Sequence, residues 1–218
     1  RQVLWVQDRA AIRLGGRPCV AGLPPDLRHR LIHVAAATPE DALFALYSGF
    51  STSVGTSGTD LTSASLRTVA KNFNDAGIPE ENRNIVIATK DYAALQADTS
   101  LAAFFANATP EAIKTGQLTN IAGLNISWSN RVPVVAGSPD STKNIALAPD
   151  AMILAMRNLP TDGNTMGARQ TVMVDAESGL SIRVTMAYNP TYLGAQVTLD
   201  VLYGVAEGRD HYGITVLP

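Results

Sequence analysis

The chain has 218 residues, of which 46% are hydrophobic and 17% are charged, so it can bury a sizeable core and is not intrinsically disordered. Its 17 lysines and arginines and 19 acids give a net charge of −2, which excludes an overall basic surface for nucleic acid or membranes. The single cysteine, Cys19, excludes an internal disulfide framework, and no apolar run is long enough to span a membrane.

The N-terminal region is the basic part of the chain. Its arginines outnumber its acids; they are Arg1, Arg9, Arg13, Arg17, Arg28 and Arg30, against Asp8 and Asp26. We interpret this excess as a solvated or interface face. Local contact of Arg9, Arg13 and Arg17 with nucleic-acid phosphates is the sharper alternative.

Other features of this end are weak. The apolar run at residues 3–6 fits a strand. His29 and His33 have the spacing of a helical zinc pair, but Arg30 and its neighbours disfavour a cation, so no metal site is predicted. Because the chain begins with Arg1 and not with methionine, we expect a processed or truncated start.

Residues 25–50 are the best candidate for a long amphipathic helix. An apolar stripe runs along this segment; its members are Leu27, Leu31, Val34, Ala35, Ala42, Leu43, Leu46 and Tyr47. Thr38 and Pro39, followed by two acids, are typical of a helix start. We therefore expect a kink or a break at Pro39, with Thr38 as the N-cap of a second helix.

The Ser/Thr/Gly-rich segment 51–63 is predicted to be a flexible surface loop. Its glycines lack the spacing and the lysine of a phosphate-binding loop, and Ser57 does not lie in a nucleophile elbow. A helix is predicted to begin at Ser63 and to end before Gly77 and Pro79. Its buried face is expected to consist of Leu66, Val69, Ala70 and Phe73.

Residues 83–160 alternate short strands with helices, which predicts a compact α/β lobe. The expected strands are 85–87, 121–128 with a turn or bulge at Gly123, 132–135 and 144–147; the expected helices are 90–97, 101–106 and 149–156. Met152, Ile153 and Met156 are interpreted as core residues. A final strand over residues 212–217 is expected to return to this lobe.

Residues 171–205 show the clearest pattern in the chain. Apolar and polar side chains alternate between Leu180 and Tyr188 and again over 197–205, and Gly179 suits the positive φ of a tight turn. This pattern predicts a three-stranded antiparallel ribbon with one apolar face. Its longer strands span about 30 Å at ~3.3 Å per residue, so we expect the helix of residues 25–50 to cover Ile182 and Val184.

No pattern of catalytic or ligand-binding residues emerges. Paired carboxylates do not recur at helical spacing in an apolar setting. Asp91, Asp150 and Asp175 stand where helix caps and turns are expected. We therefore predict no catalytic, cofactor-binding or metal-binding residue.

An ordered set of segments carries a family resemblance. The segments are 76–79 (AGIP), 83–89 (RNIVIAT), 121–130 (IAGLNISWSN), 146–152 (ALAPDAM), 174–183 (VDAESGLSIR), 188–190 (YNP) and 201–205 (VLYGV). In this order they resemble the major capsid proteins of tailed phages with the HK97-like fold, especially the P22-like coat proteins. The resemblance covers residues 41–217.

The resemblance implies an α+β fold with a compact axial α/β domain and an elongated peripheral domain, the latter built from a long helix and the antiparallel ribbon. Residues 1–62 would form the N-terminal segment and peripheral helix, 63–165 the axial domain, 166–206 the peripheral ribbon, and 207–218 the final strand returning to the axial domain. The N-terminal arm and extended loop of the family are not recognisable.

The function implied is that of a coat protein that assembles as hexamers and pentamers into an icosahedral shell around double-stranded DNA. Its location would be the virion, assembled in the host bacterial cytoplasm, with scaffolding, portal and decoration proteins as partners and weak contacts to DNA. One branch of the family cross-links its subunits, but Lys90, Lys114 and Lys143 show no reactive partner. An encapsulin-like nanocompartment shell and a soluble α/β enzyme remain as alternatives.

Overall fold

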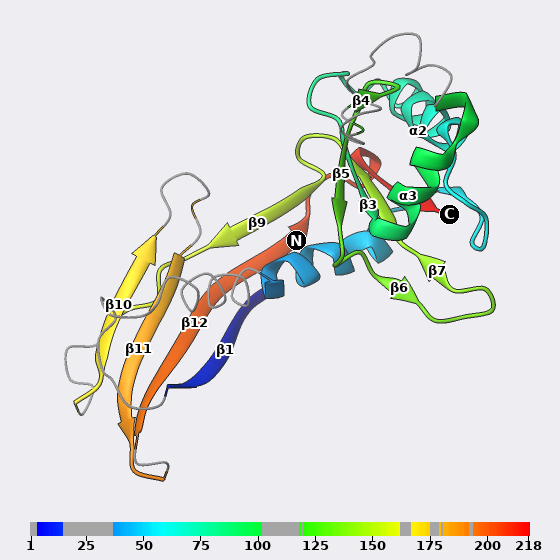
Figure 1. Ribbon diagram of the computed structural model, residues 1–218. Helices are drawn as coiled ribbons and strands as arrows, with labels where there is room; N and C mark the ends of the chain where they lie inside the picture. Colours follow the sequence, from blue (N-terminus) through cyan, green and yellow to red (C-terminus); the bar gives the residue numbers. More distant parts are fainter. Residues whose placement is uncertain are drawn as a thin grey trace. The chain divides into compact units, whose positions relative to one another are not determined.

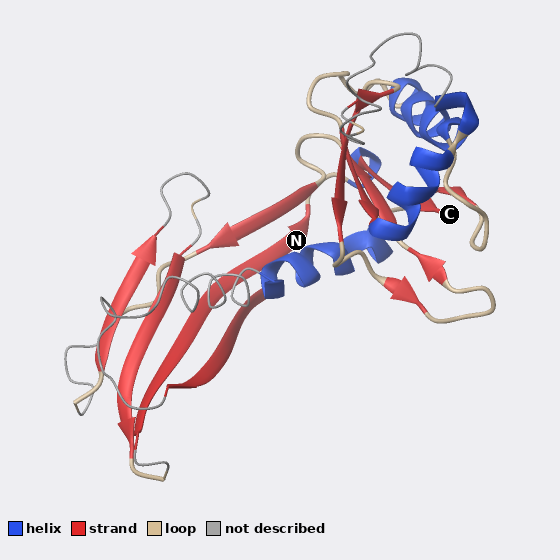
Figure 2. Cartoon of the chain, in the orientation of Figure 1, coloured by secondary structure: helices blue, strands red, loops and turns tan. Residues whose placement is uncertain are grey.

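The computed structural model describes residues 4–14, 37–101, 118, 120–161, 167–174, 179, 181–191 and 194–218. The chain divides into two compact units. The sheet unit comprises Arg1–Ala42 and Leu154–Ala206, and the α/β unit comprises Leu43–Ile153 and Glu207–Pro218. Figure 1 labels their elements, and Figure 2 distinguishes helices from strands.

A five-stranded sheet forms the sheet unit. The strands β10 (Arg169–Val174), β11 (Ser181–Asn189) and β12 (Gly194–Glu207) pair as the antiparallel ribbon predicted from the alternation. β1 (Leu4–Leu14) pairs with β12 along its whole length, so the apolar run near the N-terminus belongs to a strand much longer than predicted. In Figure 1, β12 lies between β1 and β11.

The apolar face of β12 forms the core of the sheet unit. Its buried side chains occur at every second position; they are Val197, Leu199, Val201 and Tyr203. Val184 of β11 packs with Val197 and Leu199. Ile182 and Ala42 both pack against Val201 and Tyr203, which confirms that the predicted helix contacts this face. Contact of that helix with Val184 stays a prediction, because residues 25–36 lie outside the described ranges.

A six-stranded mixed sheet, ordered β2-β13-β8-β3-β5-β4, forms the centre of the α/β unit. The strands are β2 (Thr52–Gly55), β13 (Gly213–Leu217), β8 (Asn144–Leu147), β3 (Asn84–Ala88), β5 (Leu124–Ser129) and β4 (Asn120–Ile121). β8 is antiparallel to both of its neighbours, whereas β3 and β5, and likewise β13 and β2, are parallel. The predicted strands 85–87, 144–147 and 212–217 are thereby confirmed.

The helices α2 and α3 belong to this unit. In α2 (Ser63–Asp75) the predicted face is buried, and Thr62 caps the helix by accepting a hydrogen bond from the Ser65 amide. Asp98 accepts further hydrogen bonds from the amides of Ser63 and Ser100, which hold the pKa of this carboxyl below its ordinary value. The second helix, α3 (Thr89–Ala97), confirms the helix expected at residues 90–97.

A buried arginine fixes the connection from α2 to β3. Arg83 is 2% exposed, and its guanidinium donates to the carbonyl oxygens of Ile78 and Pro79. It also lies over the ring of Phe73, with 5.5 Å between the guanidinium carbon and the ring centroid. The charge is therefore held by carbonyl dipoles and an aromatic face.

Short elements also belong to the α/β unit. These are the 3₁₀ turns at Ala45–Gly49 and Asp210–Tyr212 and a hairpin of β6 (Val134–Val135) with β7 (Ser141–Thr142). Residues 43–62, grouped from sequence with the N-terminal segment, add side chains to the cores of this unit; they are Phe44, Phe50, Val54 and Leu61.

The predicted helix start at Thr38 is wrong. Residues 37–44 are continuously helical, so Thr38 and Pro39 lie within the helix and Thr38 is not an N-cap. The pattern of cap, proline and acids was therefore correct for a helix but misplaced its beginning.

The predicted flexible loop at residues 51–63 is wrong for its first part. Residues Thr52–Gly55 form β2, an edge strand parallel to β13, and the Gly58 amide donates to the Pro218 carbonyl at 2.8 Å. Only Val54 of this strand is buried, so its sequence carries little apolar alternation. Pairing with a strand more than 150 residues away decides its conformation.

The predicted helix at residues 149–156 is also wrong, because Met152–Met156 forms β9, which pairs with β12. Asp150 has a φ of 69°, a left-handed conformation that a right-handed helix does not contain. The Gly208 and Arg209 amides donate to the carbonyls of Ala151 and Asp150. The pairing of β9 with the distant strand β12 outweighs the helix propensity of this apolar run. Periodicity alone does not decide whether such a run forms a helix or a strand.

Candidate interface surfaces

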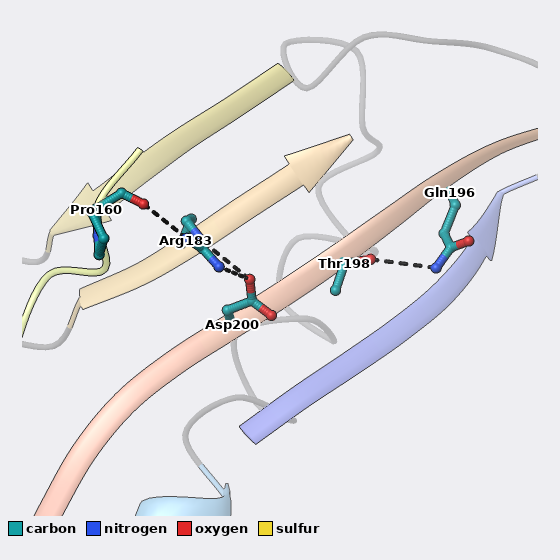
Figure 3. Close-up of polar contacts among 5 residues, drawn as sticks. All are labelled: Pro160, Arg183, Gln196, Thr198 and Asp200. Carbon is teal, nitrogen blue, oxygen red and sulfur yellow. Dashed lines mark hydrogen bonds and ion pairs between the residues drawn. The ribbon is translucent and has the colours of Figure 1, made fainter. Parts of the chain in front are cut away.

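A buried ion pair lies on the polar face of the sheet unit (Figure 3). The Arg183 Nη2 and Asp200 Oδ2 atoms are 2.6 Å apart, and Arg183 Nε donates to the same oxygen at 3.1 Å. A third bond runs from Arg183 Nη1 to the carbonyl of Pro160 at 2.8 Å. The Arg183 and Asp200 side chains are only 13% and 5% exposed, so this pair joins β11, β12 and the chain after β9 at a site shielded from solvent.

Charged positions continue across the sheet at this level. In the strand registers, Asp200 of β12 lies opposite Arg183 of β11 and also opposite Arg9 of β1. The same face of β12 carries Gln196 and Thr198, whose side chains are hydrogen-bonded at 3.4 Å (Figure 3). This polar row fixes the register, because a slip by one residue would place Asp200 among the valines and leucines of the core.

The ribbon exposes apolar side chains at two places, which lie at opposite ends of β11. Met173 and Val174, at the end of β10, are 52% and 55% exposed. Since neighbouring strand residues point to opposite faces, both faces are open at this point. Tyr188 of β11 lies on the same face as Val184, as the alternation predicts, but it is 65% exposed because the buried cluster ends before it.

The β6–β7 hairpin exposes a second apolar surface, in the α/β unit. Val134 and Val135 are 57% and 42% exposed and lie opposite Thr142 and Ser141. Lys143 follows β7 directly, and its amide donates to the Pro133 carbonyl at 2.9 Å. We call Val134, Val135 and Lys143 the hairpin surface. Exposed apolar side chains beside a charged rim are the composition expected of a protein interface.

Hydroxyl groups hold the Lys143 side chain in place. Its Nζ donates to Ser141 Oγ at 2.6 Å, and Ser141 Oγ lies 2.6 Å from Ser57 Oγ. Within the described residues, no carboxylate forms an ion pair with this ammonium group. Gly58, next to Ser57, has a φ of 91° and approaches Pro139 so closely that a Cβ would clash with its ring. Ser57, searched from sequence as a nucleophile, therefore serves here as a hydrogen-bond partner.

The sequence predicted that Asp91 caps a helix. Instead, Asp91 takes part in a buried hydrogen-bond chain and does not cap α3. It is fully buried, and its Oδ2 accepts from Asn144 Nδ2 at 2.6 Å, while Asn144 Oδ1 accepts from the Ala88 amide at 2.8 Å. Burial raises the pKa of the Asp91 carboxyl, and the nearby Asp60 raises it further, against the lowering effects of Asn144 and Lys90.

This shift predicts an unusual pH dependence at one site. Since the folded-state pKa of Asp91 lies above its unfolded value, its contribution to the free energy of unfolding improves as pH falls through the folded pKa. Asp91→Asn removes the proton linkage. We therefore expect the stability of the variant relative to the wild type to be greatest near about pH 7 and to decline toward about pH 4.

Urea unfolding of both proteins over this pH range measures the effect. Asp98→Asn is the matched control with the opposite sign, because the depressed pKa of Asp98 gives stability that is lost as pH falls. A stability difference between Asp91→Asn and wild type that does not change with pH would contradict the burial argument.

Most of the remaining candidate residues lie outside the described part of the chain. Arg13 lies in β1 with Arg9, whereas Arg17, Cys19, His29 and His33 lie outside the described residues, as do most of the predicted helix 101–106 and the lysine at 114. Among the described residues, no three His, Cys, Asp or Glu side chains gather as a metal site, and no helix is long and apolar enough to cross a membrane.

Solved shell proteins share the fold of this chain. A structure from Mycobacterium phage Che8 matches over 98% of this chain and 70% of its own, with a TM-score of 0.64 at 14% identity. The capsid structure of cyanophage P-SCSP1u matches over 98% and 71%, with a TM-score of 0.62 at 15% identity. The holo-SrpI encapsulin complex from Synechococcus elongatus matches over 99% and 73%, with a TM-score of 0.58 at 14% identity.

The fold is therefore that of phage capsid and encapsulin shell subunits, and the resemblance to tailed-phage capsid proteins is confirmed at the level of the fold. The P22-like group stays a prediction. No protein-family model matches the sequence, and no curated protein is significantly similar to it.

Proposed function

We propose that this protein is the major capsid protein of a tailed phage, which self-assembles into an icosahedral shell enclosing double-stranded DNA. One observation carries the proposal: phage capsid structures match 98% or more of the chain. Apolar side chains exposed in both units also favour self-association. In a shell each subunit acts through its contacts with other copies, so catalytic residues are not required.

In this proposal the two units take the roles of the two capsid domains. The α/β unit would be the axial domain, which gathers around five-fold and six-fold axes as pentamers and hexamers. The sheet unit, with the helix of residues 37–44, would be the peripheral domain. Scaffolding, portal and decoration proteins are the further partners expected in a virion assembled in the bacterial cytoplasm.

An encapsulin-like compartment is the second candidate, because an encapsulin shell shares the fold. The two functions differ in what the shell encloses. Particles purified from the producing cells and treated with nuclease should retain double-stranded DNA if the protein is a capsid subunit. Particles that hold a single enriched protein and no protected DNA would favour the compartment.

Contacts with DNA are proposed to be weak and independent of base sequence. With a net charge of −2, the subunit cannot neutralise a genome, so the closed shell must confine the DNA. Arg13→Gln combined with Arg17→Gln should leave the shell yield within about twofold of the wild type and lower the DNA content only modestly, since each removes a single phosphate contact.

Particle yield and absorbance of encapsidated DNA measure this prediction. Arg9→Gln is made separately, because its position opposite Asp200 links it to the sheet as well. Tight, base-specific binding of short duplexes by the isolated subunit would contradict the proposal.

A further inference from the structure

Lys143 is a half-buried cation with an incomplete set of partners. Its ammonium group donates to Ser141 Oγ, which Ser57 holds in place, and no carboxylate of the described residues pairs with it. An ammonium group has three donors. Because its position is fixed by hydroxyls beside exposed Val134 and Val135, an acidic group from outside the chain can pair with it at little entropic cost.

Two exposed carboxylates with complementary properties occur in the same unit. Glu80 and Glu81 lie side by side before β3, both exposed, and neither has an ion-pair or hydrogen-bond partner among the described residues. The ion pair of Lys71 with Asp75 in the same unit is closed within α2. Lys143 of the hairpin surface and the Glu80–Glu81 pair therefore carry opposite charges, and neither has an ion-pair partner among the described residues.

These two features lie at opposite ends of β3. The acidic pair precedes the first residue of this strand, Asn84. Lys143 precedes β8, which is antiparallel to β3 with Val86 opposite Ile145, so Lys143 lies at the level of Ala88, the last residue of β3. Four steps of ~3.3 Å from the first to the last of its five residues separate the two ends of β3 by about 13 Å. One chain therefore cannot join them, but a second copy placed head to tail can.

We propose that Lys143 of one copy pairs with the Glu80–Glu81 carboxylates of the next copy, and that this contact orients subunits head to tail in the rings of the shell. The inference rests on the proposed function. A head-to-tail contact uses two different surfaces of the subunit, as a closed ring requires. Val134 and Val135 supply the apolar part of the contact, and the charge pair supplies its orientation.

Charge reversal tests the pairing. Lys143→Glu alone, or Glu80→Lys with Glu81→Lys, should lower the yield of closed shells at least roughly tenfold, since like charges then face each other. Combining all three reversals should restore the yield to within about threefold of the wild type, because opposite charges face each other again. Lys71→Glu is the matched control and should assemble normally, since its partner lies within the same helix.

Cross-linking provides a second measurement that does not depend on yield. In a Cys19→Ser background, Lys143→Cys combined with Glu81→Cys should form, on mild oxidation, a ladder of disulfide-linked chains. Either single-cysteine variant should give no chain longer than a dimer. Circular dichroism and melting of the isolated subunits show whether each variant folds.

The outcomes separate this inference from the proposed function. If the wild type forms shells and the charge-reversed variants also assemble normally, the pairing is overturned and the shell function stands. The same conclusion follows if the triple reversal gives no rescue and the cysteine pair gives no ladder. A Lys143→Glu variant that forms shells but loses DNA would assign the lysine to phosphate and also overturn it. A wild type that never associates would remove both.

Discussion

Replacing Asp200 with alanine is expected to lower the free energy of unfolding by about 3–5 kcal/mol, because it leaves the buried guanidinium of Arg183 without its carboxylate. Both groups are well shielded, so water cannot replace the lost partner. The loss should appear as a lower urea midpoint of dissociated subunits.

The matched control replaces both partners. Arg183→Met combined with Asp200→Leu removes the charges together, and such replacements of buried pairs are often close to neutral. We expect the double variant to recover most of the stability lost by Asp200→Ala. If the single variant unfolds at the wild-type midpoint, the ion pair does not hold the ribbon together.

Replacing Val184 with aspartate is expected to abolish soluble expression or to cost several kcal/mol. Val184 is 6% exposed and packs against Val197 and Leu199, so the new carboxylate would be buried without a partner. Tyr188→Asp is the matched control: it lies four residues later on the same strand but is largely exposed, so it should change stability by less than about 1 kcal/mol.

Soluble yield and thermal melting measure both variants. A Val184→Asp protein that melts at the wild-type temperature would show that the face of β11 carrying Val184 is not the core of the sheet unit. A severe defect in Tyr188→Asp would show that the buried face extends to the end of β11.

Elements with strong local patterns were predicted from sequence. The face of α2 containing Leu66 and Phe73 repeats with helical spacing, and the residues of β12 from Val197 to Tyr203 repeat with period two. Each pattern results from burying one face against a single core, which is visible within a short window of sequence.

Elements whose conformation depends on distant partners were not predictable in this way. β9 is an apolar run that fits either a helix or a strand, and its pairing with β12 decides between them. β2 has one buried residue and owes its conformation to β13. In both cases the information lies in another part of the chain.

The candidate interface could be predicted only in part. Lys143 was one of three lysines considered from sequence for cross-linking, without a recognisable reactive partner. Its bond to Ser141 is local, but the contact of Ser141 with Ser57 joins residues 84 positions apart. The position of Asp200 between Arg183 and Arg9 likewise follows from the strand registers. An alternating strand with an acid on its polar face was the only local signal.

Electron microscopy of the purified protein tests the central claim most directly. We expect closed, icosahedral shells in which subunits gather in fives and sixes, each with the fold described for its two units. A preparation that remains monomeric at all concentrations, or that forms only irregular aggregates even in particles from the producing cells, would contradict it.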